Sequence, residues 1–342
     1  WSFGDYFKED AIKLAWSFLI NDLGLSKDRL YVTYFKGDHD DNLDADIETY
    51  NIWKEIIGEN RVIEGDKKDN FWEMGKIGPC GSCTEIHIDL RSEDIRKKID
   101  IQDVINKDNA EVIEIWNIVF IEFNRKENGD LEALPVKHVD TGMGFERLCM
   151  VTQNKTSTYD TDLFSSLIKN VTHLANVDYG GCKSTDVAIR VVVDHIRAIA
   201  FSIADGQIPS NTGAGYVVRR ILRRAVRYGY TYLHLKQPFL YGLVDTLCDQ
   251  FQDFFPELES QKDMIKNVIK EEETVFFKTL GKGLELISKS ISLLSDSVKE
   301  MSGKEVFELY DTYGFPPDLT ALILKEKGFS YNQIEFDREM EK

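Results

Sequence analysis

The chain has 342 residues, of which 42% are hydrophobic, 11% aromatic and 30% charged. This balance is typical of a folded protein with two domains of roughly 150 residues each, which excludes a disordered chain and a peptide-sized scaffold. Lys and Arg total 42 against 59 Asp and Glu, so the formal net charge of −17 excludes a protein held to nucleic acid by bulk positive charge.

The sequence contains no uninterrupted run of about 18 to 20 apolar residues, and its start lacks the features of a signal peptide. We therefore expect a cytoplasmic protein without a membrane partner. Five cysteines are too few for a disulfide framework in a chain of this length, so reduced thiols are expected. Because the first residue is Trp1 and lies within an expected strand, the sequence is interpreted as a piece of a longer chain.

The first 150 residues or so combine short helices with strands. Apolar periodicity predicts a helix near residues 10–23, and β-rich runs predict strands at residues 30–35 and 61–63. Residues 112–124 are apolar at nearly every position, which is typical of a strand covered on both faces.

Asn128 and Gly129 predict a hairpin turn after that strand, because both residues tolerate positive φ. The partner strand should return along residues 131–136. The sheet should therefore be at least partly antiparallel, which disfavours a dinucleotide-binding fold made of strand-helix-strand units.

After about residue 159 the pattern becomes helical. Helices are predicted at residues 186–204 and 216–229, and a long helical segment at residues 258–301, which we expect Gly281 and Gly283 to interrupt. The fold class is therefore α+β, with an α+β domain over residues 1–155 and a helical domain over residues 156–342.

Asp140, Gly142, Gly144 and Arg147 follow one another where a predicted strand leads into a helix. Glycines let a flat ligand approach the backbone, and an arginine in the next turn can stack on a base or pair with a phosphate. The segment is neither a dinucleotide-binding fingerprint nor a P-loop. Two interpretations stay open: a floor for a nucleotide, or a glycine-rich helix entry with a surface arginine.

Asn117 is a single amide in an apolar row, on the side of the predicted strand that we also assign to Ile115, Val119 and Ile121. A buried amide must find a hydrogen-bond partner. That partner is either a bound ligand or the neighbouring backbone.

Cys80, Cys83 and His87 have a spacing that by itself suggests three zinc ligands. A fourth ligand and a second cysteine pair are not evident, and the strand-to-helix context of a redox pair is missing. We therefore do not expect zinc in this chain.

Residues 216–229 should form an amphipathic helix whose polar face carries four arginines. They are Arg220, Arg223, Arg224 and Arg227. Such a stripe fits a phosphate backbone, but it would also fit a solvated face whose arginines pair with carboxylates of the protein.

Seven runs of the sequence, in order, resemble the alanyl-tRNA synthetases, a family of class II aminoacyl-tRNA synthetases. They are WSFGDYFK at 1–8, NFWEMG at 70–75, GPCGSCTEI at 78–86, and residues 114–124, 139–147, 209–228 and 309–319. The resemblance covers essentially the whole chain. It implies an antiparallel class II sheet with flanking helices, followed by an all-helical domain. It also implies an enzyme that uses ATP and Mg²⁺ to join alanine to tRNA(Ala).

The resemblance implies a role for each residue of the expected alanine pocket. Asp140 would receive the α-ammonium group, and Asn117 would face the carboxylate end. Trp72 and Val119 would be the walls of the side-chain pocket, with Gly142 as its floor.

The same resemblance assigns the ATP and metal contacts. Arg147 would contact the triphosphate and adenine, beside Gly142 and Gly144. Glu85 and Glu114 are the candidate ligands of Mg²⁺. Together with Asp140 and Asn117, Arg147 forms the expected catalytic set.

For tRNA, the resemblance places the arginine helix in the domain that recognises the acceptor stem, and no DNA partner is expected. Asn211 and Asp311 would read its G·U pair, since an amide and a carboxylate suit the donors and acceptors of base edges. Taken alone, Asp311 would be interpreted as a cap or turn residue.

The sequence departs from the family at two positions. Ser82 stands where the family usually has proline, which we expect to loosen that loop, and Ala214 replaces an arginine that could contact phosphate. By resemblance, motif 1 and most of motif 2 precede Trp1, and the editing domain follows Lys342. The rival functions are an inactive paralogue or truncated module that binds RNA, and a zinc-dependent hydrolase or redox protein.

Overall fold

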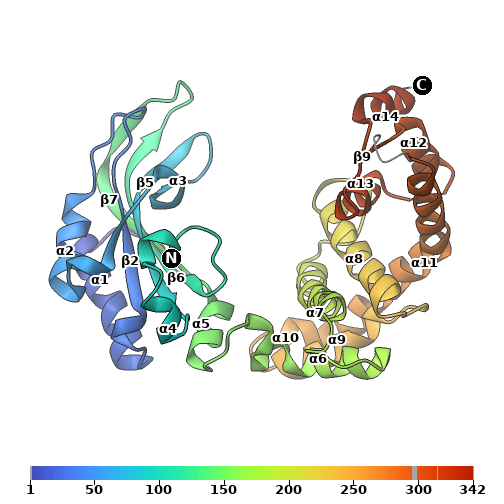
Figure 1. The fold of residues 1–342 in the computed structure, drawn as a ribbon, viewed down its shortest axis with the longest axis horizontal. Helices are drawn as coiled ribbons and strands as arrows, with labels where there is room; N and C mark the ends of the chain where they lie inside the picture. Colours follow the sequence, from blue (N-terminus) through green and yellow to red (C-terminus); the bar gives the residue numbers. More distant parts are fainter. Residues whose placement is uncertain (1, 295–298, 314, 342) are drawn as a thin grey trace. The chain divides into compact units, whose positions relative to one another are not determined.

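The computed structural model describes residues 2–294, 299–313 and 315–341, so Trp1, Gly314 and part of the predicted helix at 258–301 lie outside the described residues. The chain forms two compact units, Trp1–Thr161 and Asp162–Lys342 (Figure 1). The division follows Thr161, whereas the sequence predicted it after residue 155.

A seven-stranded mixed sheet forms the centre of the first unit. Its order is β1 (Ser2–Phe3), β7 (Leu131–Met143), β6 (Val112–Arg125), β5 (Gly78–Asp89), β2 (Leu30–Phe35) and β3 (Val62–Gly65), with β4 (Phe71–Glu73) also paired to β5. Only the pair of β2 and β3 is parallel among these strands. The α+β class with an antiparallel sheet is therefore confirmed.

Helices cover one face of this sheet. They are α1 (Lys8–Ser17), which continues as a π-helical turn (Phe18–Asp22), α2 (Ile47–Ile57) and α5 (Phe145–Thr152). Ile12, Trp53 and Met150 from these helices pack on Ile118 and Phe120 of the sheet, and all five are buried. The shorter helices α3 (Lys67–Asn70) and α4 (Glu93–Arg96) lie in the connections.

The β6–β7 hairpin turns where it was predicted. Gly129 has φ +91°, and the Asn128 side chain accepts a hydrogen bond from the backbone of Asp130 at 3.1 Å. The return strand is longer than predicted, since it continues to Met143. This extra length carries Asp140 and Gly142 into the sheet.

A β-bulge in β6 corrects one prediction. The pairing shifts from Ile86 with Trp116 to His87 with Glu114, which leaves Ile115 as the extra residue. Ile115 is therefore buried in the helix-covered core, and Glu114 lines the same cleft as Asn117. The prediction that Ile115 shares a side with Asn117 is wrong, because a bulge reverses the alternation of a strand.

Ser82 does not loosen the chain, contrary to expectation. It is buried within β5, and its hydroxyl donates to Asp46 Oδ2 at 2.7 Å. Asp46 also accepts from Lys8 Nζ at 2.8 Å. The serine is thus part of a buried polar cluster, and the proline's stiffness is replaced by a hydrogen bond.

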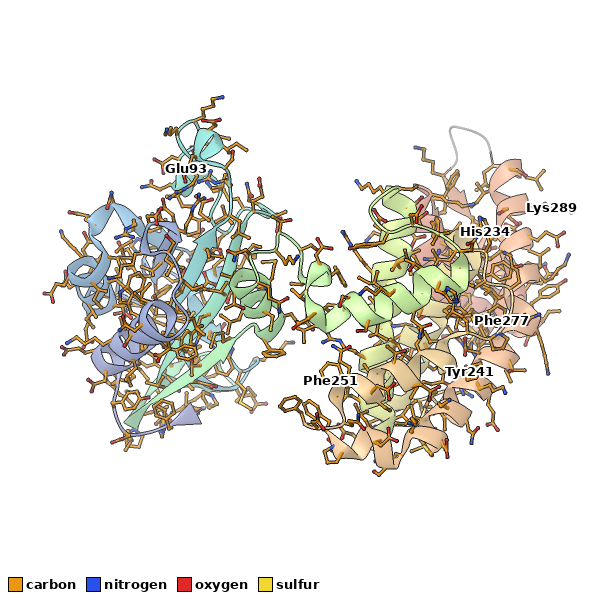
Figure 2. The ribbon with its side chains drawn as sticks, turned by 90° about the horizontal axis from the view of Figure 1, so that it is seen from below. Glu93, His234, Tyr241, Phe251, Phe277 and Lys289 are labelled. Atoms are coloured by element: carbon orange, nitrogen blue, oxygen red, sulfur yellow. The ribbon has the colours of Figure 1, made fainter. Side chains whose placement is uncertain are left out.

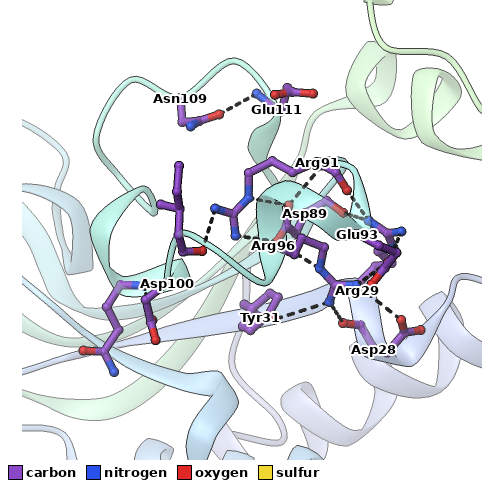
Figure 3. Close-up of polar contacts among 12 residues, drawn as sticks. Asp28, Arg29, Tyr31, Asp89, Arg91, Glu93, Arg96, Asp100, Asn109 and Glu111 are labelled. Carbon is purple, nitrogen blue, oxygen red and sulfur yellow. Dashed lines mark hydrogen bonds and ion pairs between the residues drawn. The ribbon is translucent and has the colours of Figure 1, made fainter.

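A buried ion network ties residues 90–111 to the end of β5 (Figure 3). Arg91 binds both oxygens of the fully buried Asp89, with Nε 2.9 Å from Oδ1 and Nη2 2.7 Å from Oδ2. Arg96 Nε lies 3.3 Å from the same carboxylate, and Arg29 Nη1 donates to the Asp89 carbonyl at 3.2 Å. Arg91 also donates to the carbonyl of Ile99 at 3.1 Å, which holds the connection that follows α4.

We expect Asp89→Ala to lower the free energy of unfolding by about 3 kcal/mol, because it leaves two arginines without their buried counter-charge. The exposed Asp94 in α4 gives a matched control, and Asp94→Ala should change stability by less than about 0.5 kcal/mol. Urea unfolding followed by circular dichroism measures both. Equal stability of the two variants would contradict the structural role of the network.

The second unit is helical. Its helices are α6 (Asp162–Ala175), α7 (Lys183–Ala204), α8 (Gly213–Tyr232), α9 (Leu243–Phe251), α10 (Pro256–Ser260), α11 (Lys262–Leu293), α12 (Gly303–Asp311), α13 (Pro317–Glu326) and α14 (Gln333–Met340). Two-residue strands β8 (Glu300–Met301) and β9 (Ser330–Tyr331) pair in parallel. Phe251, labelled in Figure 2, forms an aromatic cluster with Phe201 and Phe255, at ring distances of 6.0 and 6.1 Å. None of the helices in the described ranges is long and apolar enough to cross a membrane.

Helix α11 runs without a break through Gly281 and Gly283, so the predicted interruption is wrong. A Cβ at Gly283 would lie 2.1 Å from Cδ2 of Phe315, and one at Gly281 would lie 2.9 Å from the Tyr230 hydroxyl. The glycines therefore allow two rings to pack against the helix. Glycine costs about 1 kcal/mol relative to alanine in a helix, which this close packing offsets.

Candidate active site and nucleic-acid interface

Most predicted site residues of the first unit lie on the sheet face opposite the helix-covered core. They occur in two adjacent cross-strand rows, Glu85–Asn117–Gly142 and Cys83–Val119–Asp140. Paired residues of antiparallel strands point to the same face with their Cα atoms about 4.5–5.5 Å apart. The sheet therefore brings Asp140, Asn117 and Gly142 together, although 25 positions separate Asn117 from Gly142 in the sequence.

A cleft of about 670 Å³ lies on this face. Its lining includes Trp72, Cys83, Glu85, Glu114 and Asn117. A second cleft of about 360 Å³ contains Arg147 and shares Lys68, Asp69 and Glu114 with the first. The two clefts thus adjoin along these three residues, so one ligand with two ends can contact both.

Asn117 Oδ1 is buried and has no hydrogen-bond partner among the described residues. Leaving a buried acceptor unpaired costs about 1–3 kcal/mol. Of the two interpretations of this amide, the structure favours the one in which a bound ligand supplies the partner. The neighbouring backbone does not satisfy this oxygen.

The wall beside Asn117 is apolar. Val119 and Cys83 are buried in one cluster with Ile121, and the half-buried Trp72 packs against them. Gly81 allows β5 and β6 to approach closely beside this wall, because a Cβ at Gly81 would lie 1.9 Å from the Phe120 carbonyl oxygen. Such a wall suits a small apolar group.

Glu85 is buried and held by three donors on Oε2. They are Asn106 Nδ2 at 2.8 Å, Thr33 Oγ1 at 3.1 Å and His87 Nε2 at 3.2 Å. Burial alone would raise the pKa of Glu85, but the interactions with His87, Asn106 and Thr33 outweigh it and hold that pKa below its usual value. Glu85 is therefore a carboxylate at neutral pH, and Oε1 receives no donor from the described part of the chain.

Arg147 lies in the first turn of α5 and is half exposed. Its Nη1 donates to the Glu114 carbonyl at 2.7 Å and lies 3.2 Å from Glu114 Oε2. Gly144 caps the helix, and a Cβ there would be 3.1 Å from Arg147 Cδ. A Cβ at Gly142 would meet nothing within 4 Å, so the space above it is open.

Two carboxylates beside one cleft fit Mg²⁺, which proteins bind through one or two carboxylates together with substrate phosphates. The two predicted ligands, Glu85 and Glu114, both line the cleft, as do Asp69 and Glu73. Over the described residues, no three His, Cys, Asp or Glu side chains come together as metal ligands. Cys80 and Cys83 lie in different apolar clusters, and burial raises the pKa of both thiols.

Thr33, Asn106 and Lys68 belong to the site but were not predicted. Thr33 and Asn106 bind Glu85, and Lys68 lines both clefts. Thr33 could have been found from its central strand, where a buried hydroxyl needs a partner. Asn106 lies in an irregular loop with φ +54°, and no local pattern indicates that it reaches β5.

The arginine helix is α8, and the structure separates its four predicted arginines. Arg223 donates to Glu272 at 2.9 Å, and Arg227 is buried with both Nη atoms on Glu326, at 2.8 and 2.7 Å. The interpretation that carboxylates of the protein pair with this face therefore holds for Arg223 and Arg227.

The other two arginines are less engaged. Arg220 is 56% exposed and lies 3.8 Å from Asp318, while the Arg224 guanidinium lies 5.9 Å from the Tyr228 ring centre. An arginine with a distant counter-charge can exchange it for a phosphate at little cost. Arg220 is thus the most accessible of the predicted phosphate contacts.

Asn211 and Asp311 lie in different parts of the second unit. Asn211 is exposed in the turn before α8, where its Oδ1 accepts a hydrogen bond from Arg219 Nη1. Asp311 is the last residue of α12 and is exposed. Both side chains are accessible to a large ligand.

Comparisons with known proteins agree on one family. A family model described as tRNA synthetases class II (A) matches residues 1–342. The chain is 55% identical to the alanine–tRNA ligase of Christiangramia forsetii, 53% to that of Flavobacterium psychrophilum and 54% to that of Bacteroides fragilis. Each match covers 100% of the chain and 39% of the relative, so the chain spans about two fifths of these relatives' length.

Proposed function

Because the chain belongs to the class II (A) tRNA synthetase family, we propose that it is the catalytic and tRNA-recognition part of an alanine–tRNA ligase. The first unit would activate alanine with ATP. The alanine carboxylate would attack the α-phosphorus, giving alanyl-adenylate and releasing pyrophosphate. The 3′ ribose hydroxyl of tRNA(Ala) would then accept the alanyl group, releasing AMP.

The observation that carries this proposal is the Asn117 amide oxygen, an unsatisfied acceptor that an N–H of a substrate ammonium group would satisfy, in a cleft on the sheet face that also presents Asp140. A carboxylate suits an ammonium group, and the apolar wall of Trp72 and Val119 suits a methyl group. An amino acid with a small side chain supplies both. The open space above Gly142 supports an adjoining position for the rest of the adenylate.

Catalysis would rest on positioning and on charge stabilisation, without a covalent enzyme intermediate. Asp140 would hold the ammonium group so that the alanine carboxylate faces the α-phosphate. Arg147 would bind the phosphates in the second cleft, exchanging its present contact with Glu114 for them. Glu85 and Glu114 would hold Mg²⁺, which disperses the negative charge of the phosphates.

The test is alanine-dependent exchange of pyrophosphate into ATP by the intact protein that carries this chain. Exchange with alanine and not with larger amino acids supports the proposal. No exchange would favour the rival of an inactive paralogue that only binds RNA. Stoichiometric zinc in the purified protein, with activity lost on chelation, would favour the zinc-dependent hydrolase or redox protein.

Gly142→Ala should raise the KM for alanine and for ATP in this exchange by about 10- to 100-fold, because the added methyl group occupies space proposed for the adenylate, and one methyl group in a binding site is worth about 1–3 kcal/mol. Nothing in the protein lies within 4 Å of the added Cβ, so the midpoint of thermal unfolding should not change. Gly181→Ala is the matched control, since its Cβ also enters open space. An unchanged alanine KM in Gly142→Ala would show that the ligand lies elsewhere.

A further inference from the structure

Arg219 connects the candidate base reader to the interior of the helical unit. Its Nη1 donates to Asn211 Oδ1, and its Nε lies 3.1 Å from Glu272 Oε1. Glu272 belongs to α11, and only 11% of its side chain is exposed. The same Oε1 lies 2.8 Å from Arg223 Nη2. The carboxylate of this largely buried residue is therefore the counter-charge of two arginines of α8, through a hydrogen bond from Arg223 and an ion pair with Arg219 that has no hydrogen-bond geometry.

The hydrogen-bonding groups of Arg219 and Asn211 determine which atom of the Asn211 side-chain amide faces outward. A side-chain amide has an acceptor oxygen and an NH₂ group with two donors, whereas a guanidinium has donors only. Arg219 can therefore hold only the oxygen of Asn211. Because Asn211 is exposed, its NH₂ group is the end left for an external partner.

We propose that Arg219, held in place by Glu272, positions Asn211 so that its NH₂ group donates to an acceptor on the base pair. This inference rests on the proposed function, in which Asn211 reads the acceptor stem. The wide, shallow minor groove of an RNA helix exposes such acceptors. Arg219 is a positioning residue, since it acts on the RNA through Asn211.

Glu272 has a second effect on the same surface. The two arginines Arg219 and Arg223 alone carry a charge of +2, and pairing with the Glu272 carboxylate reduces the net charge of the three side chains to +1. Each arginine released to a phosphate would add affinity that does not depend on sequence. Glu272 thus favours selective binding over strong binding.

The inference is tested by charging tRNA(Ala) and its G·C counterpart with the intact protein and comparing kcat/KM for the two. Arg219→Ala should lower the preference for G·U by about 10-fold, within the range of one lost base contact, while alanine-dependent ATP–pyrophosphate exchange stays unchanged. Arg219→Lys, which keeps a donor for Asn211, should restore most of the preference. Arg220→Ala, by contrast, should weaken the binding of both tRNAs equally and reduce the salt dependence of that binding, as expected for the loss of a phosphate contact.

Glu272→Ala gives a change that misfolding cannot imitate. It should tighten the binding of an unrelated RNA by about 3- to 10-fold at low salt, because two arginines become available, while the G·U preference falls. If Asn211→Ala loses the preference and Arg219→Ala keeps it, the positioning role is overturned and the proposed function stands. If Asn211→Ala also keeps the preference, the assignment of Asn211 as the base reader is itself overturned.

Discussion

Asp140→Ala should reduce alanine-dependent ATP–pyrophosphate exchange by about 10³-fold in the intact protein. Truncating one partner of a hydrogen-bonded charge pair in a protected site costs about 2–5 kcal/mol, and every 1.36 kcal/mol is a factor of ten. Asp140 is paired with Val119 in the row next to Asn117, so its carboxylate belongs to the cleft face. The parameter that decreases should be the kcat/KM for alanine in the exchange reaction.

Two controls separate the role of the charge from a general loss of structure. Glu132 is exposed on the same strand, and Glu132→Ala should leave exchange unchanged. Asp140→Asn preserves the shape of the side chain but removes its charge, and it should be nearly as inactive as Asp140→Ala. Exchange at normal rates in Asp140→Ala would contradict the assigned site.

Asn211→Ala and Asp311→Ala should impair charging of G·U-bearing tRNA far more than they impair adenylate formation. One bidentate base contact is worth about 1–3 kcal/mol, so each variant should lose about 10- to 100-fold in kcat/KM for tRNA. Both residues lie in the helical unit, whereas the candidate adenylate residues lie in the first unit. Pyrophosphate exchange should therefore remain normal.

The tRNA provides the matching control for this second prediction. Replacing its G·U pair with G·C should reduce charging by the unaltered protein and have little further effect on the two variants. Equal loss of exchange and of charging would contradict the assigned reading roles. So would a uniform loss for both tRNAs, which is the behaviour of phosphate contacts.

Local sequence patterns predicted those elements of the first unit that depend only on the types of neighbouring residues. The β-rich run at residues 30–35 forms β2 at those positions, and the turn at Gly129 closes the β6–β7 hairpin. The bulge at Ile115 was not predictable, because it depends on how β6 pairs with β5 and not on β6 alone. It decides that Glu114 lines the cleft and that Ile115 enters the core.

Distant contacts account for the other differences. The arginines of α8 have the predicted spacing, but Glu272 and Glu326, which pair with Arg223 and Arg227, are 49 and 99 positions away. From its residue type alone, Gly283 predicts a helix break. The structure shows that it instead leaves room for the ring of Phe315, which is distant in the sequence. In the candidate site, the residues that the resemblance singled out on β5, β6 and β7 lie on one sheet face, whereas the donors on Glu85 come from segments far apart in the sequence and follow no local pattern.

The most direct test is a crystal structure of the protein with a sulfamoyl analogue of alanyl-adenylate. The analogue's amine should lie within 3.2 Å of the Asp140 carboxylate, at hydrogen-bond distance, with its methyl group against Trp72 and Val119. Its adenine should lie beside Gly142 and Arg147. An analogue bound away from this sheet face, or a cleft filled by protein side chains in the complex, would contradict the assignment of this cleft.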